Sequence, residues 1–109
     1  MTTKKPRPRS LPGVTFEMQT QCGKIYVTIT RDVEGKPFEI FARFGKAGGC
    51  GAAIFDGLTK ILSYALRSGM EPDNIVKAFS GISCHLGGNT CLNAVAEAFN
   101  MFNHDSNCV

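Results

Sequence analysis

Thiol side chains are the residues of this sequence with the greatest chemical potential. The chain holds five cysteines in 109 residues, and four of them stand in turns or near the starts of predicted helices: Cys22, Cys50, Cys84 and Cys91. A thiol at a helix N-terminus faces unpaired N–H groups and the positive end of the helix dipole, which favour the thiolate. Thiolates bind metal, so these four predict one tetrahedral site. Cys108, in a polar stretch, is expected to be a free thiol.

The pattern of the cysteines leaves other interpretations open. Paired CxxC knuckles are absent, and cysteine often fills space in a core, so packing is the alternative to metal binding. His85 adjoins Cys84 and would be a substitute ligand if one cysteine were not used. A secreted disulfide framework usually has an even number of cysteines and a signal peptide. The odd count and the polar, basic start therefore predict a cytoplasmic protein.

A glycine-rich stretch offers a second candidate site, for an anion. Gly48, Gly49 and Gly51 let backbone N–H groups approach a phosphate, and Lys46 adds positive charge. The spacing is not that of a Walker loop. The alternative is a tight strand-to-helix turn that positions Cys50.

The elements that must position these residues follow from hydrophobic periodicity. Apolar and polar residues alternate over residues 14–19, 25–30 and 38–44, which predicts three half-buried strands. Short connections make such strands antiparallel neighbours. Spacing then changes to that of helices: a long one from Cys50 to about Ser68, a short one after Pro72 and a last one over residues 91–103. The expected apolar face of the long helix is Ile54, Leu58, Ile61, Leu62 and Ala65.

The order of these elements predicts an α+β fold, a three-stranded antiparallel β-meander followed by three helices packed on one face of the sheet. The length suits one domain, over residues 13–103, followed by a tail over residues 104–109. Residues 1–12 are basic and proline-rich and predict a flexible arm. This arm is either a solubilising tail or a weak contact for nucleic acid. No apolar run reaches the roughly 20 residues of a membrane helix, so no membrane association is expected.

Seven stretches together follow the pattern of a known family: residues 7–9, 11–15, 22–28, 35–41, 45–50, 65–69 and 81–84. They resemble the C-terminal domain of adenosylcobalamin-dependent ribonucleotide reductases, often called the TSCPD domain after a motif at its last cysteine. In this chain Thr90 and Cys91 fit that motif, while Leu92 and Asn93 stand where the family has Pro and Asp.

A looser resemblance is carried by Cys22-Gly23, by residues 49–54 and by a cysteine before the final helix. These features are similar to iron–sulfur-cluster assembly scaffolds, which have a βββααα fold and clustered cysteines that hold zinc or a nascent cluster. Lys24 stands where those scaffolds have an acidic residue, which argues against cluster transfer.

The two resemblances imply a place in deoxynucleotide supply and a metal, zinc or alternatively an iron–sulfur cluster, on the four cysteines. The radical chemistry of that reductase family needs a large barrel and a cobalamin site, which 109 residues do not hold. We therefore expect a non-catalytic accessory module that binds no cobalamin alone and has a ribonucleotide reductase catalytic subunit as its partner. One alternative is a stand-alone protein that binds a nucleotide or small anion as a homo-oligomer. The other alternative is an iron–sulfur or zinc carrier.

Overall fold

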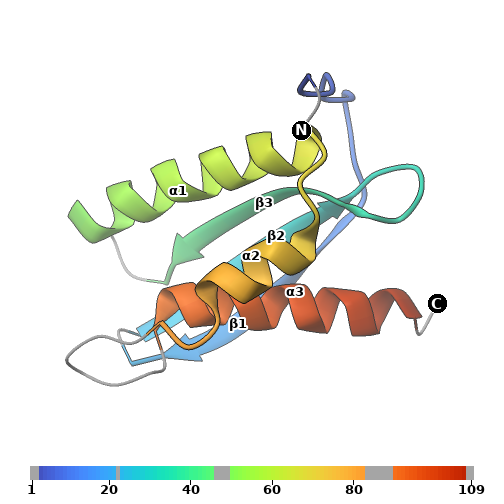
Figure 1. Ribbon diagram of the computed structural model, residues 1–109. Coiled ribbons are helices and arrows are strands. Elements are labelled where there is room, and N and C mark those ends of the chain that lie inside the picture. The colour runs from blue at the N-terminus through green and yellow to red at the C-terminus, as the bar shows by residue number, and fades with distance from the viewer. Residues whose placement is uncertain (1–2, 22, 46–49, 83–89, 108–109) are drawn as a thin grey trace.

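The computed structural model of the chain describes residues 3–21, 23–45, 50–82 and 90–107. Three strands are followed by three helices, which confirms the α+β prediction (Figure 1). The elements are β1 (Gly13–Thr20), β2 (Gly23–Arg31), β3 (Pro37–Phe44), α1 (Cys50–Arg67), α2 (Pro72–Phe79) and α3 (Cys91–Asn107).

The strands form one antiparallel sheet in the order β1-β2-β3, as the short connections predict. Phe16 pairs with Val27 and Val27 with Ala42, so the alternating apolar residues of the three strands share one face. Central residues such as Ile25 and Ile29 on that face are fully buried. The alternation therefore gives the sheet a helix-covered face and an outward face.

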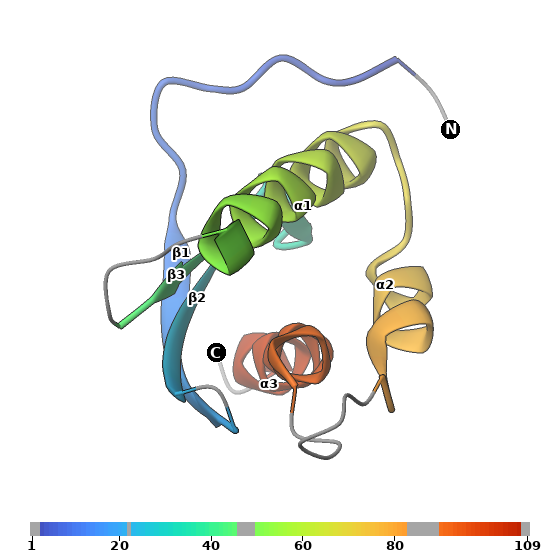
Figure 2. The ribbon, with the colours of Figure 1, turned by 90° about the vertical axis from the view of Figure 1, so that its left-hand side faces the viewer.

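The helices build a layer on the buried face of the sheet. Figure 2 shows α1 and α3 on the same side of the strands, with α2 farther from the sheet. The helix α1 contacts β3, α3 contacts β1 and β2, and α2 packs on α3. Phe99 and Phe102 of α3 are the largest fully buried side chains, and Ile75 anchors α2 to the same core.

The orientation of α1 corrects the sequence analysis. Leu62 is buried as expected, but Ile54 and Ile61 lie exposed, and the buried stripe also includes Phe55 and Leu66. The helix is thus turned about its axis from the orientation that apolar spacing predicts.

A polar contact with the edge of the sheet accounts for this rotation. The backbone N–H of Ile40 donates to Ser63 Oγ at 3.0 Å, and Ser63 Oγ donates to the carbonyl of Ile40 at 2.9 Å. Both edge groups of β3 at this residue are therefore satisfied by α1. Hydrogen-bonded polar groups can be buried, so Ser63 and Thr59 take positions that spacing alone assigns to apolar residues.

Two helix ends test the predicted boundaries. Gly69 follows α1 with a φ of 103°, and the N–H of Met70 donates to the carbonyl of Ala65 at 3.0 Å, so glycine ends this helix as expected. The helix α3 continues to Asn107, although a tail was expected from residue 104. No Gly or Pro stands in residues 103–107 to stop the helix earlier.

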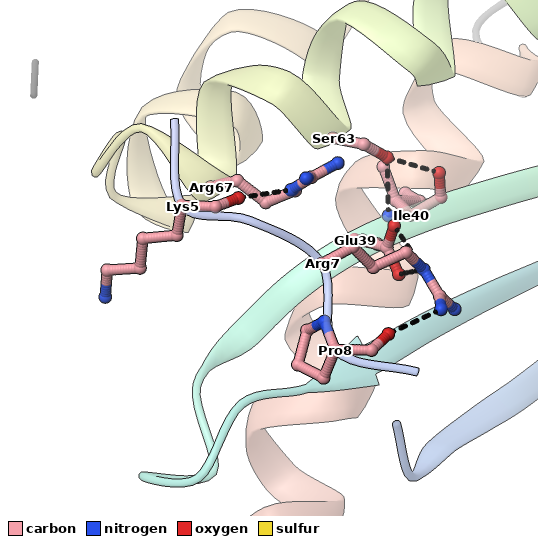
Figure 3. Close-up of polar contacts among 7 residues, drawn as sticks. All are labelled: Lys5, Arg7, Pro8, Glu39, Ile40, Ser63 and Arg67. Atoms are coloured by element: carbon pink, nitrogen blue, oxygen red, sulfur yellow. Dashed lines mark hydrogen bonds and ion pairs between the residues drawn. The ribbon is translucent and has the colours of Figure 1, made fainter. Parts of the chain in front are cut away.

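The N-terminal arm lies against the folded domain, where sequence alone suggests flexibility (Figure 3). The N–H of Lys5 donates to the carbonyl of Arg67 at 3.0 Å, and Arg67 Nε donates to the carbonyl of Lys5 at 3.0 Å. Arg7 Nε lies 2.9 Å from Glu39 Oε1. The arm is therefore joined to the end of α1 and to β3. Within the described ranges, no helix is long and apolar enough to cross a membrane.

Candidate functional site

The structure describes two of the four predicted thiolate ligands. Cys50 and Cys91 are the first residues of α1 and α3, as the sequence analysis expects. Cys91 is half-buried and packs against the core. Cys22, Cys84 and Cys108 lie outside the described residues, so the predicted four-cysteine site stays a prediction.

The sheet brings the β1–β2 turn, which contains Cys22, close to the end of β3, from which the chain continues to Cys50. Thr20 pairs with Gly23 across the two strands, and Thr20 Oγ1 donates to the carbonyl of Gly23 at 2.7 Å. The residues on either side of the β1–β2 turn are therefore held together. The N–H of Gly45, just after β3, donates to the carbonyl of Lys24 at 2.9 Å. The chain therefore leaves β3 toward Cys50 from beside the β1–β2 turn.

The start of α3 lies at the same end of the molecule. In Figure 1 the β1–β2 turn, the start of α1 and the start of α3 are all on the left, and Figure 2 looks onto this end. The described parts of the chain therefore bring three of the four cysteine-bearing regions to one end of the fold, as a shared site requires. We call this part of the molecule the cysteine end.

The first turn of α3 is held by a capping network that fixes where Cys91 begins the helix. Thr90 Oγ1 accepts a hydrogen bond from the N–H of Asn93 at 3.1 Å and donates to the carbonyl of Ile82 at 2.7 Å. Asn93 Oδ1 accepts from the N–H of Gly81 at 3.1 Å. Thr90 is buried and stands as the N-cap, which satisfies one of the unpaired donors of the helix.

This network gives a structural role to two positions of the family motif. The sequence analysis gave Thr90 as fitting the motif and Asn93 as standing where the family has Asp, but it did not find that they cap α3 and tie it to the end of α2. The available signal was a threonine before a helical apolar stripe, with an amide side chain three residues later. Cys91 is thus presented at a helix N-terminus, where the dipole favours a thiolate.

The remaining predicted residues are not assembled by the described part of the chain. Residues 3–21, 23–45, 50–82 and 90–107 contain no group of three or more His, Cys, Asp or Glu side chains that could hold a metal ion. Of the candidate anion-binding residues, Gly51 is the second residue of α1. Lys46, Gly48, Gly49 and His85 fall outside the described residues.

A groove that the sequence analysis missed lies at the β3 edge, between the outward face of the strands and the start of α1. Its volume is about 890 Å³. Phe41 and Tyr26 are exposed side chains of its wall, and Arg43, paired with Tyr26 across the strands, supplies a positive charge. Gly45, Ala52 and the acidic Asp56 also line the groove. Aromatic residues at polar positions of the strand alternation were the available signal.

Comparison with known proteins identifies the family of the chain. No curated protein and no solved structure matches it. The TSCPD domain matches residues 1–102, which is almost all of the 109 residues and includes Cys22, Cys50, Cys84 and Cys91. The chain therefore belongs to the TSCPD domain family.

Proposed function

We propose that this chain is a non-catalytic accessory module of ribonucleotide reduction that holds one zinc ion at its cysteine end. The family is associated with ribonucleotide reductases. The observation that carries the metal assignment is the gathering of the β1–β2 turn and the starts of α1 and α3 at one end of the fold. Cys22, Cys50 and Cys91 belong to these three regions, and Cys84 belongs to the segment that leads to the capped start of α3.

The chemistry of the donor set fits a structural ion. Four thiolates close a tetrahedral zinc site and leave no coordination position for water or substrate. The helix dipoles at Cys50 and Cys91 favour the deprotonated ligands. Bound zinc would join the hairpin turn to the starts of two helices, so its role would be to hold this end of the domain together.

Elemental analysis of protein purified without an affinity metal tests the assignment. We expect about one zinc per chain, most of it lost in Cys50→Ser and retained in Cys108→Ser. The second substitution is the matched control because it also removes one thiol from the same chain. Protein that is metal-free, with Cys50→Ser melting like the parent, would overturn the zinc site. Iron with sulfide and a brown colour on anaerobic purification would favour the carrier alternative.

The accessory role requires a partner that carries the catalytic chemistry. A separate ribonucleotide reductase catalytic subunit is the expected one, because this chain is too short for the barrel. Purified chain should retain such a subunit on a column, and addition of the chain should change the activity of that subunit. Absence of both effects with the subunit from the same genome would contradict the role.

A second candidate function, nucleotide binding, is favoured by the groove beside β3. Phe41 and Tyr26 offer exposed rings on which a base can stack, and Arg43 offers charge for a phosphate. Gly45 lines the groove, and in the sequence it comes just before the stretch that contains the candidate anion-binding glycines. A ligand in the groove would thus have a base-sized apolar wall and donors for its phosphates.

Thermal shift against a panel of ribonucleotides and deoxyribonucleotides tests this second function. Phe41→Ala and Arg43→Ala should each remove the stabilisation by the best ligand. Lys77→Ala is the matched control for charge, since Lys77 lies on α2 and does not line the groove. A panel that gives no shift, or a shift that Arg43→Ala leaves unchanged, would exclude the groove as the site.

A further inference from the structure

The outer face of α1 carries large apolar side chains that remain exposed. Ile54 is 73% exposed, Ile61 is 62% exposed and Tyr64 is 45% exposed. The opposite face of the same helix is buried through Phe55, Leu62 and Leu66, so α1 is apolar on both sides. Large apolar side chains that gather on an exposed face mark an interaction site more often than single ones do. The outer face of α1 therefore has the character of an interface.

The arrangement of residues on this face is self-complementary. Gly57 lies in the middle of the face, with Ile54 and Ile61 in a row along one side of it and Asp56 and Lys60 in a row along the other. The midpoints of both rows fall next to Gly57, because Ile54 and Asp56 precede it and Ile61 and Lys60 follow it. A two-fold axis beside Gly57 therefore places each row opposite the same row of a second copy, running in the opposite direction.

We propose that two copies of this chain associate through α1, packed antiparallel across a two-fold axis beside Gly57. In this arrangement Ile54 of one copy meets Ile61 of the second copy on one side of the contact. Asp56 meets Lys60 of the second copy on the other side. Each pair occurs twice, so two apolar pairs and two opposite-charge pairs flank the crossing point.

The centre of the contact and its charges support a second copy as the occupant. Among the described residues, no atom lies within 4 Å of a Cβ built on Gly57, so their packing does not require the glycine. A glycine in a helix interior is unfavourable on its own, but it lets another helix approach closely. Neither Asp56 nor Lys60 forms an ion pair within the described residues. An antiparallel α1 from a second copy supplies opposite charges to both Asp56 and Lys60, which an unrelated partner would have to supply separately.

The contact should be weak, because one helix pair covers little surface. Interfaces below about 1,200 Å² in total are typical of transient association. We therefore expect a reversible dimer whose fraction rises with protein concentration. Because the N-terminal arm lies near Tyr64, with Lys4 Nζ 4.0 Å from the centre of that ring, it flanks the contact at the C-terminal end of α1.

Sedimentation equilibrium of the full chain over a wide concentration range tests the proposal. Ile61→Glu should weaken the dimer at least tenfold, while Val33→Glu, at a fully exposed turn, should leave it unchanged. Asp56→Lys and Lys60→Asp should each weaken association, and the double variant should restore it because the exchanged charges still match.

Gly57→Leu separates association from folding. A Cβ at this position meets no atom of the described residues, and leucine favours the helix over glycine, so the melting temperature at low concentration should rise while the dimer is lost. A chain that stays monomeric throughout would overturn the proposal, as would a dimer that Gly57→Leu and Ile61→Glu both leave intact. If the monomer instead binds a reductase catalytic subunit and Ile61→Glu abolishes this, the face belongs to that subunit and the second copy is excluded.

Discussion

At Ser63 one hydroxyl both accepts from and donates to the same residue of the sheet edge. The buried Oγ lies 3.0 Å from the nitrogen and 2.9 Å from the oxygen of Ile40. Ser63→Ala would leave that N–H and carbonyl without the partner that α1 supplies. We expect the free energy of unfolding to fall by about 1–3 kcal/mol, the cost of a buried unsatisfied polar group, as measured by urea denaturation.

The control for this prediction is an exposed serine that comes directly after another helix. Ser80 follows α2 and is exposed, and its side chain makes no hydrogen bond with the described residues that would be lost. Ser80→Ala should change the free energy of unfolding by less than about 0.5 kcal/mol. Equal effects of Ser63→Ala and Ser80→Ala would mean that the edge contact contributes nothing.

Arg7 neutralises a carboxylate that the fold buries. Glu39 is 4% exposed, and Arg7 Nε donates to both of its oxygens, at 2.9 and 3.0 Å. Arg7→Ala should lower the free energy of unfolding by about 1–2 kcal/mol, a value discounted for the partial exposure of the guanidinium. Thermal melting checks it, with Arg9→Ala as the control, since Arg9 forms no ion pair with the described residues. If Arg7→Ala in the Glu39→Gln background costs as much as in the parent, the ion pair is not the cause.

At the scale of elements, the N-terminal arm should be a part of the folded domain. It contributes the two hydrogen bonds between Lys5 and Arg67 as well as the pair of Arg7 with Glu39. Deletion of residues 1–9 should therefore lower the melting temperature by several degrees, and by more than Arg7→Ala does. Deletion of residues 1–3 keeps all these contacts and should have little effect. If the arm is dispensable, as its composition suggests, the two truncated proteins would have the same melting temperature.

The elements themselves differ in how far sequence determines them. The three strands follow from alternation, because period two forces Ile25 and Ile29 to one face whatever packs on it. The rotation of α1 does not follow from spacing. It depends on Ser63 finding the edge of β3, a contact between residues distant in the chain. For the same reason the docking of the arm on Glu39 could not be inferred from a run of prolines and basic residues.

At the scale of the whole molecule, the candidate site was predictable in its parts but not in its assembly. Cys50 and Cys91 could be placed at helix starts because glycines and a capping threonine precede them. That these starts lie at the same end as the β1–β2 turn depends on the path of the chain around the sheet. The family pattern fits at Thr90 and is replaced at Asn93, and only the hydrogen bonds explain what these two residues do.

If zinc occupies the cysteine end, metal binding and the stability of the whole domain must be coupled. The ion would link β1–β2, α1 and α3, which otherwise meet through the apolar core. A strong chelator should therefore lower the melting temperature of the parent to that of Cys50→Ser, and it should leave Cys50→Ser itself unchanged. Metal binding requires deprotonated thiols, so the difference between parent and variant should shrink as the pH is lowered. A parent that melts identically with and without the chelator, and at the same temperature as Cys50→Ser, would show that the cysteines contribute only packing.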